Sequence, residues 1–536
     1  MKKQVLSLAL LVASMTISAG VVYVAPDGTG DGTSWDSPLG NIQDAIKQAK
    51  LDETGQTDVW LKGGTYMLES AITLGDSVNL YGGFAGTETT VDERAKNSND
   101  PWDFANLTII DAQNKDIPCA KANKNGGYKQ PLIVDGIVFQ NGRALAANSD
   151  NGGGIRLNLN VTLQNSIVRN CYSDNAGGGV QMYPGGNMHG CLLENNRQET
   201  GGNGGGAVNL NTGSSGVEAH ITNCVFRGNS TNVRGGAINC QGGTDYYIDA
   251  CTFYNNYSID AKGELTNGGV IYDNGSQKSH ITNCVLFNNS GKQTIYLKAN
   301  EFCNNTLVKN VGNLWIAAGA TTGKVCNNVV WNCYTAADEA TPTSIAGNAI
   351  SGLTVVNNYT YNPVPDTKSW VLSLDPDVAN SNVQFVSNTT NEDFTPAEGT
   401  DYGSKSLKGP HFCKLSDFSG AVLEEDADIK AALLAQLDSV DLHITDKSAL
   451  LDAGIELETI TSDRDGNIRP QDGKTDVGAY EYVANIGSAI ENTEKAPIDI
   501  QAALQAGEVY NLLGQRVGEL QAGNIYIVGG QKVLMR

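Results

Sequence analysis

Two short signatures of apolar, Gly and Asn residues alternate along the central part of the chain. The first is a Gly-Gly pair followed by small and apolar residues, as in the segment from Gly235 to Ile238. The second is an apolar residue followed by two variable residues and an Asn, as from Phe226 to Asn229. The first apolar position recurs at Ile155, Val180, Val208, Ile238 and Ile271, and the second at Leu193, Phe226, Phe253 and Leu286. Successive copies are 25 to 33 residues apart, so the two signatures mark one repeating unit.

Each unit contains short strands and no helical periodicity. Apolar and polar residues alternate in short runs such as Ile221 to Phe226, which is typical of strands. Gly and Asn between these runs tolerate the positive φ angles of tight corners. Repetition in register predicts an all-β solenoid, a parallel β-helix, with neighbouring coils about 4.8 Å apart and Asn side chains stacked at the corners. We expect this domain to span residues 21–485.

Two segments outside the repeat have helical patterns. An amphipathic run with Ile42, Ala45, Ile46 and Ala49 on one face predicts a helix that caps the open first coil. After the repeat fades, residues 426–440 predict a short helix. Its apolar face is expected to contain Ile429, Leu433, Leu434 and Leu437.

The composition fits this fold and excludes other classes of protein. Gly makes up 62 of the 536 residues, 40% of the residues are hydrophobic, and no Gly-X-Y period is present. These features exclude collagen and bulk disorder. The net charge of −22 argues against nucleic acid as a partner, because nucleic acids bind basic surfaces.

Several of the eleven Cys residues recur at one position of the repeat, as Cys224, Cys251 and Cys284 do. A Cys at a fixed repeat position is typical of a small apolar side chain stacked in a core. We therefore expect mainly buried free thiols, with some disulfides as the alternative.

The first 20 residues have the pattern of a signal peptide. Lys2 and Lys3 precede an apolar run from Val5 to Val12 that is too short to span a bilayer. Ser18 and Gly20 are the small residues expected before a cleavage site. No later segment reaches 18 apolar residues, so we expect an exported mature chain without a transmembrane helix.

The repeats resemble those of chlamydial polymorphic outer-membrane proteins and of the broader right-handed β-helix proteins of the pectate-lyase-like type. The opening segment from Tyr23 to Trp35 is similar to the start of such domains. The resemblance implies a right-handed parallel β-helix over residues 21–485 and leaves the activity open.

The C-terminal part resembles modules that end exported bacterial proteins. Residues 450–482 are similar to a closing motif of bacterial β-helix domains, and residues 486–507 have the composition of a polar linker. Residues 508–536 resemble the C-terminal sorting domain of type IX secretion in Bacteroidetes. This resemblance implies an outer-membrane secretion machinery as partner, and a location on the outer-membrane surface or outside a Gram-negative cell. A small hairpin docked on the end of the β-helix is the alternative.

The charged candidates occupy one position of the second signature. Arg169, Glu194 and Arg227 follow its apolar residue, so they should point outward from neighbouring coils as a charge ladder. In a β-elimination lyase, an Arg or Lys would take the proton next to a uronate carboxylate, and acidic residues would hold Ca²⁺. The alternative is a solvated ladder in which Glu194 offsets the two Arg residues. No equivalent position carries acids on adjacent coils, which counts against a calcium or hydrolase site there.

Two further groups have possible ligand chemistry. Asp463, Asp465 and Asn467 have a calcium-like spacing, but Lys474 replaces the acid that an EF-hand loop needs at its twelfth position. A structural turn is the alternative. His220, Tyr247 and His280 align as a ladder that suits a sugar or a metal, with drift of a surface strand as the alternative.

Taken together, these features favour an exported, non-catalytic β-helix protein that binds a polysaccharide or surface glycan, as an adhesin would. The alternative is a polysaccharide-degrading enzyme, and a uronate lyase fits better than a glycoside hydrolase. A structural spacer is the third possibility. No cofactor is required in the first case, and Ca²⁺ is the candidate ion in the second.

Overall fold

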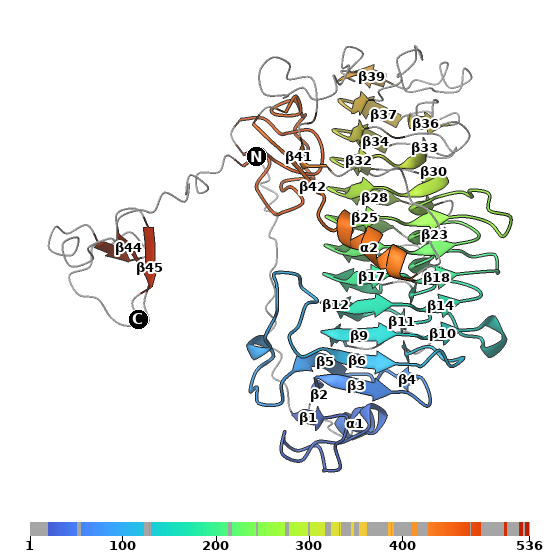
Figure 1. Cartoon of the computed structure of the whole chain (residues 1–536), viewed down its shortest axis with the longest axis vertical. Coiled ribbons are helices and arrows are strands. Elements are labelled where there is room, and N and C mark those ends of the chain that lie inside the picture. Colours follow the sequence, from blue (N-terminus) through green and yellow to red (C-terminus); the bar gives the residue numbers. More distant parts are fainter. Residues whose placement is uncertain are drawn as a thin grey trace, which may run out of the picture. The chain divides into compact units, whose positions relative to one another are not determined.

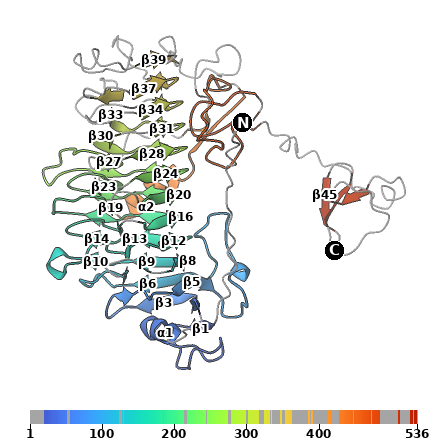
Figure 2. The same ribbon diagram turned by 180° about the vertical axis from the view of Figure 1, so that it is seen from behind.

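The chain winds around a common axis, and its stacked strands form three long parallel sheets (Figure 1). The computed structural model describes residues 20–50, 55–122, 128, 130–183, 185–212, 217–242, 245–273, 278–298, 301–316, 323–331, 333, 345–347, 353–361, 384–386, 389–390, 410, 412–415, 427–446, 448–471, 473–483, 509–511, 525–528 and 531–534. The predicted signal peptide and the linker at 486–507 therefore lie almost wholly outside the described residues. The predicted parallel β-helix is confirmed (Figures 1 and 2).

Nearly all described strands of the β-helix belong to three sheets, A, B and C. Sheet A contains β1 (Val21–Val24), β2 (Thr57–Lys62), β5 (Val78–Phe84), β8 (Leu132–Asp135), β12 (Val161–Gln164), β16 (Asn187–His189), β20 (Ala219–Thr222), β24 (Tyr246–Asp249), β28 (Ser279–Thr282), β31 (Glu301–Cys303), β34 (Gly323–Cys326), β37 (Leu353–Val356) and β39 (Gln384–Val386). Sheet B contains β3 (Gly64–Met67), β6 (Thr108–Asp111), β9 (Ile137–Gln140), β13 (Ile167–Arg169), β17 (Leu192–Glu194), β21 (Val225–Arg227), β25 (Thr252–Tyr254), β29 (Val285–Phe287), β32 (Thr306–Val308), β35 (Val329–Trp331), β38 (Tyr359–Tyr361) and β40 (Thr389–Thr390). Sheet C contains β4 (Ile72–Thr73), β7 (Ala120–Lys121), β10 (Arg143–Ala144), β11 (Ile155–Leu157), β14 (Tyr172–Ser173), β15 (Val180–Met182), β18 (Arg197–Gln198), β19 (Val208–Thr212), β22 (Ser230–Thr231), β23 (Ile238–Gly242), β26 (Tyr257–Ser258), β27 (Ile271–Asp273), β30 (Ser290–Leu297), β33 (Val311–Ile316) and β36 (Ile345–Gly347). Short 3₁₀ turns lie at Val91–Glu93 and Ala146–Asn148.

The register of these strands follows the repeat that the sequence shows. Val208 pairs with Ile238 in sheet C, and Ile238 pairs with Ile271 on the next coil. In sheet B, Phe226 pairs with Phe253, whose ring is stacked on it at 4.7 Å. Identical repeat positions therefore lie above one another, and their apolar side chains fill a continuous interior core.

The Asn residues of the second signature form a buried ladder along one corner. Asn229 donates through its backbone N–H (3.1 Å) and its Nδ2 (2.9 Å) to the Oδ1 atom of Asn256. Asn256 donates in the same way to Asn289, at 2.9 and 3.0 Å. The column runs from Cys171 through Asn196, Asn229, Asn256, Asn289 and Asn310 to Cys333. Within the signature, positive φ falls on the residue before each ladder Asn, such as Asn255 with a φ of 54°.

The two Gly residues of the first signature meet different structural requirements. Gly235 has a φ of 70°, a region that L side chains rarely adopt. A Cβ atom on Gly236 would lie 2.1 Å from the carbonyl oxygen of Gly269 on the next coil. The first Gly therefore makes the corner possible, and the second allows the coils to approach closely.

All eleven Cys residues are free thiols, and all but Cys413 are buried. Cys191, Cys224, Cys251 and Cys284 stack along a second corner. There, the backbone N–H of Cys224 donates to the Sγ atom of Cys251 at 3.5 Å. The column continues from Cys284 to Asn305, which accepts its N–H at 2.9 Å. The expectation of buried core thiols is confirmed.

Helix α1 (Ile42–Ala49) packs on the first coil at one end of the stack (Figure 1). All four residues of its predicted apolar face, Ile42, Ala45, Ile46 and Ala49, are buried. Asn41 caps the helix, because its side chain accepts the backbone N–H of Asp44 at 3.0 Å. The predicted capping helix is confirmed.

Helix α2 (Ala427–Leu437) lies against the outer side of the middle coils (Figure 1). Leu434 and Leu437 are buried in an apolar cluster with Tyr254 and Phe287 of sheet B. The predicted place of Ile429 on the apolar face is wrong, because its side chain is 57% exposed. The face that packs on the coils passes through Lys430, Leu434 and Leu437, so Ile429 falls at its margin.

The segment that follows α2 returns along the coils toward the later repeats. It contains β42 (Asp441–Ile444), which pairs in antiparallel fashion with β41 (Phe412–Lys414). The backbone N–H of Ala479 donates to Thr306 Oγ1 at 3.0 Å, and Asn357 Nδ2 donates to the carbonyl oxygen of Ala453 at 2.6 Å. The closing motif is therefore fixed to the side of the coils by contacts between residues far apart in the sequence.

A fully buried ion pair lies inside the closing motif. The Nη1 atom of Arg469 lies 2.5 Å from Glu481 Oε1, and both side chains are 1% exposed. The same guanidinium donates to the carbonyl oxygens of Asp476 (3.1 Å) and Gly478 (2.8 Å). The backbone N–H of Asp476 donates in turn to Glu481 at 2.9 Å, so the turn depends on both charges.

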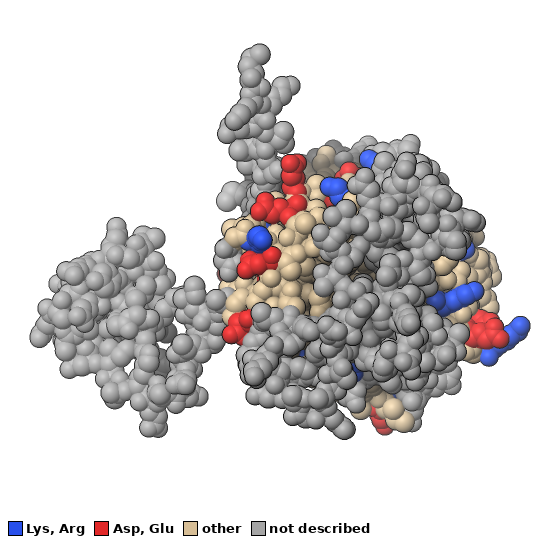
Figure 3. Space-filling model, turned by 90° about the horizontal axis from the view of Figure 1, so that it is seen from above, with Lys and Arg blue, Asp and Glu red and all other residues tan. Residues whose placement is uncertain are grey.

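The chain divides into two compact units, Met1–Tyr482 and Val483–Arg536. The second contains an antiparallel sheet of β43 (Val509–Asn511), β44 (Ile525–Val528) and β45 (Gln531–Leu534). Among the described residues, no helix is both long and apolar enough to cross a membrane. Seen from above, the coloured acidic and basic side chains lie in small separate groups (Figure 3).

Candidate functional site

The predicted charge ladder exists on the outer face of sheet B. Arg169 pairs with Glu194, Glu194 with Arg227, and Arg227 with Tyr254 in the strand register. The expected alignment of these residues is confirmed. Their functional role stays a prediction.

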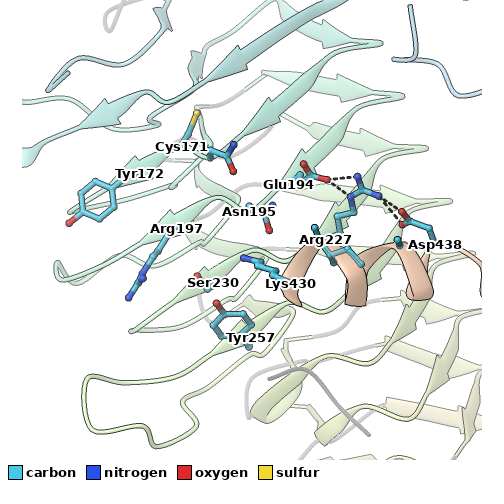
Figure 4. A pocket seen from close by; sticks show the side chains of 14 residues that line it. Cys171, Tyr172, Glu194, Asn195, Arg197, Arg227, Ser230, Tyr257, Lys430 and Asp438 are labelled. Carbon is cyan, nitrogen blue, oxygen red and sulfur yellow. Dashed lines mark hydrogen bonds and ion pairs between the residues drawn. The ribbon is translucent and has the colours of Figure 1, made fainter. Parts of the chain in front are cut away.

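A groove of about 850 Å³ runs between the middle coils and α2 (Figure 4). One side of the groove is formed by the corner between sheets B and C, and the other side by one face of α2. The lining residues are Asn170, Cys171, Tyr172, Glu194, Asn195, Arg197, Arg227, Ser230, Tyr257, Lys430, Ala431, Leu434, Ala435 and Asp438. Two of the three ladder candidates, Glu194 and Arg227, therefore belong to one cavity.

Arg227 joins the ladder to α2. Its guanidinium forms an ion pair with Glu194, with 2.5 Å between Nε and Oε2. Its Nη1 lies 2.8 Å from each carboxylate oxygen of Asp438, just beyond the end of α2, and 3.1 Å from the Tyr254 hydroxyl. Figure 4 shows the bonds to Glu194 and Asp438 as dashed lines. Although burial opposes it, the charges around Arg227 raise the pKa of its guanidinium, so Arg227 stays protonated.

This arrangement corrects the idea of a solvated ladder. The side chains of Arg227 and Glu194 are only 22% and 15% exposed, because α2 covers them. Arg169 lies outside the lining of the groove. Its guanidinium donates to the Gln140 side chain at 2.8 and 2.9 Å instead of pairing with an acid.

Lys430 is a cation in the groove lining for which no ion pair is described. Its side chain is directed from α2 into the cavity (Figure 4), and its Nζ donates to the carbonyl oxygen of Gly228 at 3.3 Å. Burial lowers the pKa of this amine, and the nearby Arg197 adds to that effect while Glu194 opposes it. No ion pair described for this chain involves Lys430, whereas Arg197 pairs with Glu199. A partly desolvated amine therefore faces the groove.

The sequence did not indicate Lys430 or Asp438 as site residues. Asp438 lies 211 positions after Arg227, its ion-pair partner. The amphipathic pattern around residues 426–440 was the available signal, because it predicted a helix whose apolar face packs against another part of the protein. It did not say which coils the helix would cover.

The calcium-like segment forms a tight turn in the closing motif. The Asp463 carboxylate accepts the backbone N–H groups of Asp465 (2.9 Å), Asn467 (2.8 Å) and Glu481 (2.9 Å). Asp465 contacts His443 Nε2 at 2.6 Å. Burial alone would lower the pKa of His443, but its bonds to Asp465 and Asp441 raise it to about 9. This geometry fits the structural turn, and calcium binding there stays a prediction.

The aligned His220, Tyr247 and His280 form a stack on sheet A. The ring centroids of His220 and Tyr247 are 4.8 Å apart, and those of Tyr247 and His280 are 4.4 Å apart. Glu218 contacts both His220 (3.2 Å) and Tyr247 (3.4 Å). Within the described part of the chain, no group of three or more His, Cys, Asp or Glu residues is placed to hold a metal ion. Because the rings lie face to face, this ladder offers mainly ring edges to a ligand.

Comparison with known proteins gives few matches. No protein-family model and no curated protein matches the chain. Among solved structures, it is similar to the pectate lyase Pel9A, with 14% identity, a TM-score of 0.40, and coverage of 88% of this chain and 98% of that one. It is also similar to the pectin methylesterase from Aspergillus niger, with 11% identity, a TM-score of 0.23, and coverage of 71% and 90%. Similarity at this level does not indicate an activity for this chain, so the function depends on the chemistry of the groove itself.

Proposed function

We propose that this protein binds an acidic saccharide in the groove beneath α2. The observation that carries the proposal is Lys430, an amine that burial disfavours in its charged form and that has no described carboxylate partner. A carboxylate or other anionic group of a saccharide would offset this cost by a charge-assisted hydrogen bond. Arg197 lies close enough to influence Lys430 and provides a second cation for the same ligand.

The rest of the lining also suits a saccharide. The cavity of about 850 Å³ lies within the usual size range of small-molecule sites, which is about 300–1,000 Å³. Asn170 and Asn195 supply polar groups for sugar hydroxyls, and Tyr172 supplies aromatic surface. This lining supports binding of a short stretch of a longer glycan.

The binding proposal is tested by calorimetric titration of the full chain with oligogalacturonates and, in parallel, with neutral maltooligosaccharides. We expect the acidic oligomers to bind preferentially and Lys430→Ala to weaken them by about tenfold or more, because a charged hydrogen bond contributes about 1.5–3 kcal/mol. The matched control is Lys262→Ala, an exposed lysine outside the groove lining. Equal affinity of Lys430→Ala and the unchanged protein for the acidic oligomers would contradict the proposal.

A lyase is the second candidate, and the lowered pKa of Lys430 favours it over the Arg residues as the base. A neutral amine can take a proton from the carbon next to a uronate carboxylate, whereas Arg227 is held protonated between two carboxylates. In the same samples, release of unsaturated products would appear as increasing ultraviolet absorbance. Turnover that disappears in Lys430→Ala would favour the enzyme over simple binding.

We also propose that the protein is exported and displayed on, or released from, the outer membrane of a Gram-negative cell. The signal-like residues 1–20 and the sorting-like residues 508–536 support this location. The separate C-terminal unit with its small antiparallel sheet is compatible with a sorting module.

Deletion of residues 508–536 tests the sorting role. We expect the truncated protein to be lost from the cell surface and the medium and to accumulate inside the envelope, as measured by protease accessibility of intact cells. A matched control removes only residues 486–495 of the linker and should retain surface location. Unchanged surface location after the C-terminal deletion would reject the sorting role.

A further inference from the structure

One corner position of the coils beside the groove lacks the side chain that its neighbours have. Between sheets B and C, the residue with positive φ is Asn on the coils before and after it, at Asn141, Asn170, Asn195, Asn255 and Asn288. The coil of Arg227 has Gly228 instead, with a φ of 63°, close to the 54° of both Asn195 and Asn255. Because Asn tolerates this conformation on the adjoining coils, the backbone does not require Gly at position 228.

The missing side chain leaves two buried amide groups unpaired. Further along this corner, Asn288 Nδ2 donates to Asn255 Oδ1 on the preceding coil, at 3.4 Å. Gly228 interrupts that pattern. In the part of the chain that the structure describes, the buried atoms Asn195 Oδ1 and Asn255 Nδ2, on the two sides of Gly228, have no hydrogen-bond partner. Unpaired buried amide groups cost free energy, so Gly is unfavourable here for the stability of the fold.

The side chain of Lys430 lies against this empty position. A Cβ atom on Gly228 would be 3.3 Å from Lys430 Cε and 2.4 Å from Asn195 Oδ1. The Nζ atom of Lys430 donates to the carbonyl oxygen of the same Gly228, and Figure 4 shows the side chain directed from α2 toward the coils. A distance of 3.3 Å is shorter than the best separation of two carbon atoms, which is about 3.5–4.0 Å. A larger residue at position 228 would therefore push Lys430 away from the corner.

We propose that Gly228 is a positioning residue of the saccharide site, because its missing side chain makes the room in which Lys430 is held beside Asn195 and Arg197. Its role in binding rests on the proposed function, whereas the placement of Lys430 does not. Residues at functional sites often break a local rule that stability alone would favour. The residue that gives the most stable corner at position 228 is then not the residue that gives the tightest binding.

Gly228→Asn tests the placement of Lys430 without any ligand. Burial lowers the pKa of the Lys430 amine, and we expect Gly228→Asn to return this pKa toward its ordinary value. The pH dependence of acylation by acetic anhydride, measured by mass spectrometry of the Lys430 peptide, reports this pKa. The urea midpoint should be at least that of the unchanged protein, because the new amide can pair with Asn195 and Asn255. The matched control is Gly263→Asn, since Gly263 also has a positive φ (83°) and open space around its Cβ position.

Calorimetric titration with oligogalacturonates tests the role of Gly228 in binding. Gly228→Asn should weaken binding about tenfold, and the double variant with Lys430→Ala should bind no more weakly than Lys430→Ala alone, because Gly228 acts through Lys430. Additive losses in the double variant would overturn the proposal. So would a Lys430 pKa that Gly228→Asn leaves unchanged, or a lower urea midpoint in that variant. If the pKa shifts but even the unchanged protein binds no oligogalacturonate, the proposed ligand is wrong and the placement of Lys430 by Gly228 is supported.

Discussion

Asn256→Ala should lower the free energy of unfolding by about 4 kcal/mol, because it interrupts the buried ladder in the middle of the stack. Asn256 is fully buried. Its Oδ1 accepts two hydrogen bonds from Asn229, and its Nδ2 donates to the carbonyl oxygen of Phe226 at 2.9 Å and to Asn289 at 3.0 Å. The Ala side chain leaves several buried polar groups without partners, and each costs about 1–3 kcal/mol. Urea unfolding followed by circular dichroism measures the loss.

Asn256→Cys is the matched control for this ladder. Cys occupies the two ends of the same column, where Asn310 donates to Cys333 Sγ at 3.7 Å. A thiol accepts hydrogen bonds weakly, so we expect Asn256→Cys to cost about half as much stability as Asn256→Ala. Equal unfolding midpoints for Asn256→Ala and the unchanged protein would show that the ladder contributes little to stability.

Arg469→Met should destabilise the closing motif by about 3–5 kcal/mol, because it leaves the buried carboxylate of Glu481 without its cation. Burial raises the pKa of Glu481, and Arg469 lowers it. Without Arg469 the pKa should rise further, so the carboxyl group is neutral at low pH and charged at high pH. The penalty should therefore be small near pH 4 and full near pH 8. Urea unfolding at both pH values measures it.

The double variant Arg469→Met with Glu481→Gln separates charge burial from packing. Removing both charges should recover most of the lost stability, because a neutral amide costs far less to bury than an unpaired carboxylate. The result would differ if the side chain of Arg469 mattered mainly for its volume. In that case the double variant would be as unstable as the single one at both pH values.

Much of the fold could be predicted because each coil repeats the same local rules. The spacing of Phe226, Phe253 and Leu286 set the register, and the Asn that follows each of them marked the corner. The capping helix could also be predicted, because its apolar face with Ile42 and Ile46 packs against the adjacent first coil. These features depend on neighbours within about one repeat, which a sequence pattern can show.

The groove could be predicted only in part, because it depends on contacts across long sequence separations. Glu194 and Arg227 were visible as aligned charges on the coils. Lys430 and Asp438 come from a segment with no repeat, and nothing in its pattern encodes the coil on which it docks. The apolar face of that helix was also misplaced at Ile429, since packing at one end of α2 decides which side is buried.

The return segment after α2 has a consequence for how this chain can vary in length. It is tied to the coils at Arg227 through Asp438, at Ala250 through Arg464, at Thr306 through Ala479 and at Asn357 through Ala453. The spacing of these four contacts therefore fixes the number of coils that can lie between them. A coil inserted between Arg227 and Asn357 would move some of these points apart by about 4.8 Å and break the match. Coils before Arg227 make none of these four contacts, so growth or loss of repeats is tolerated best at the N-terminal end of the solenoid.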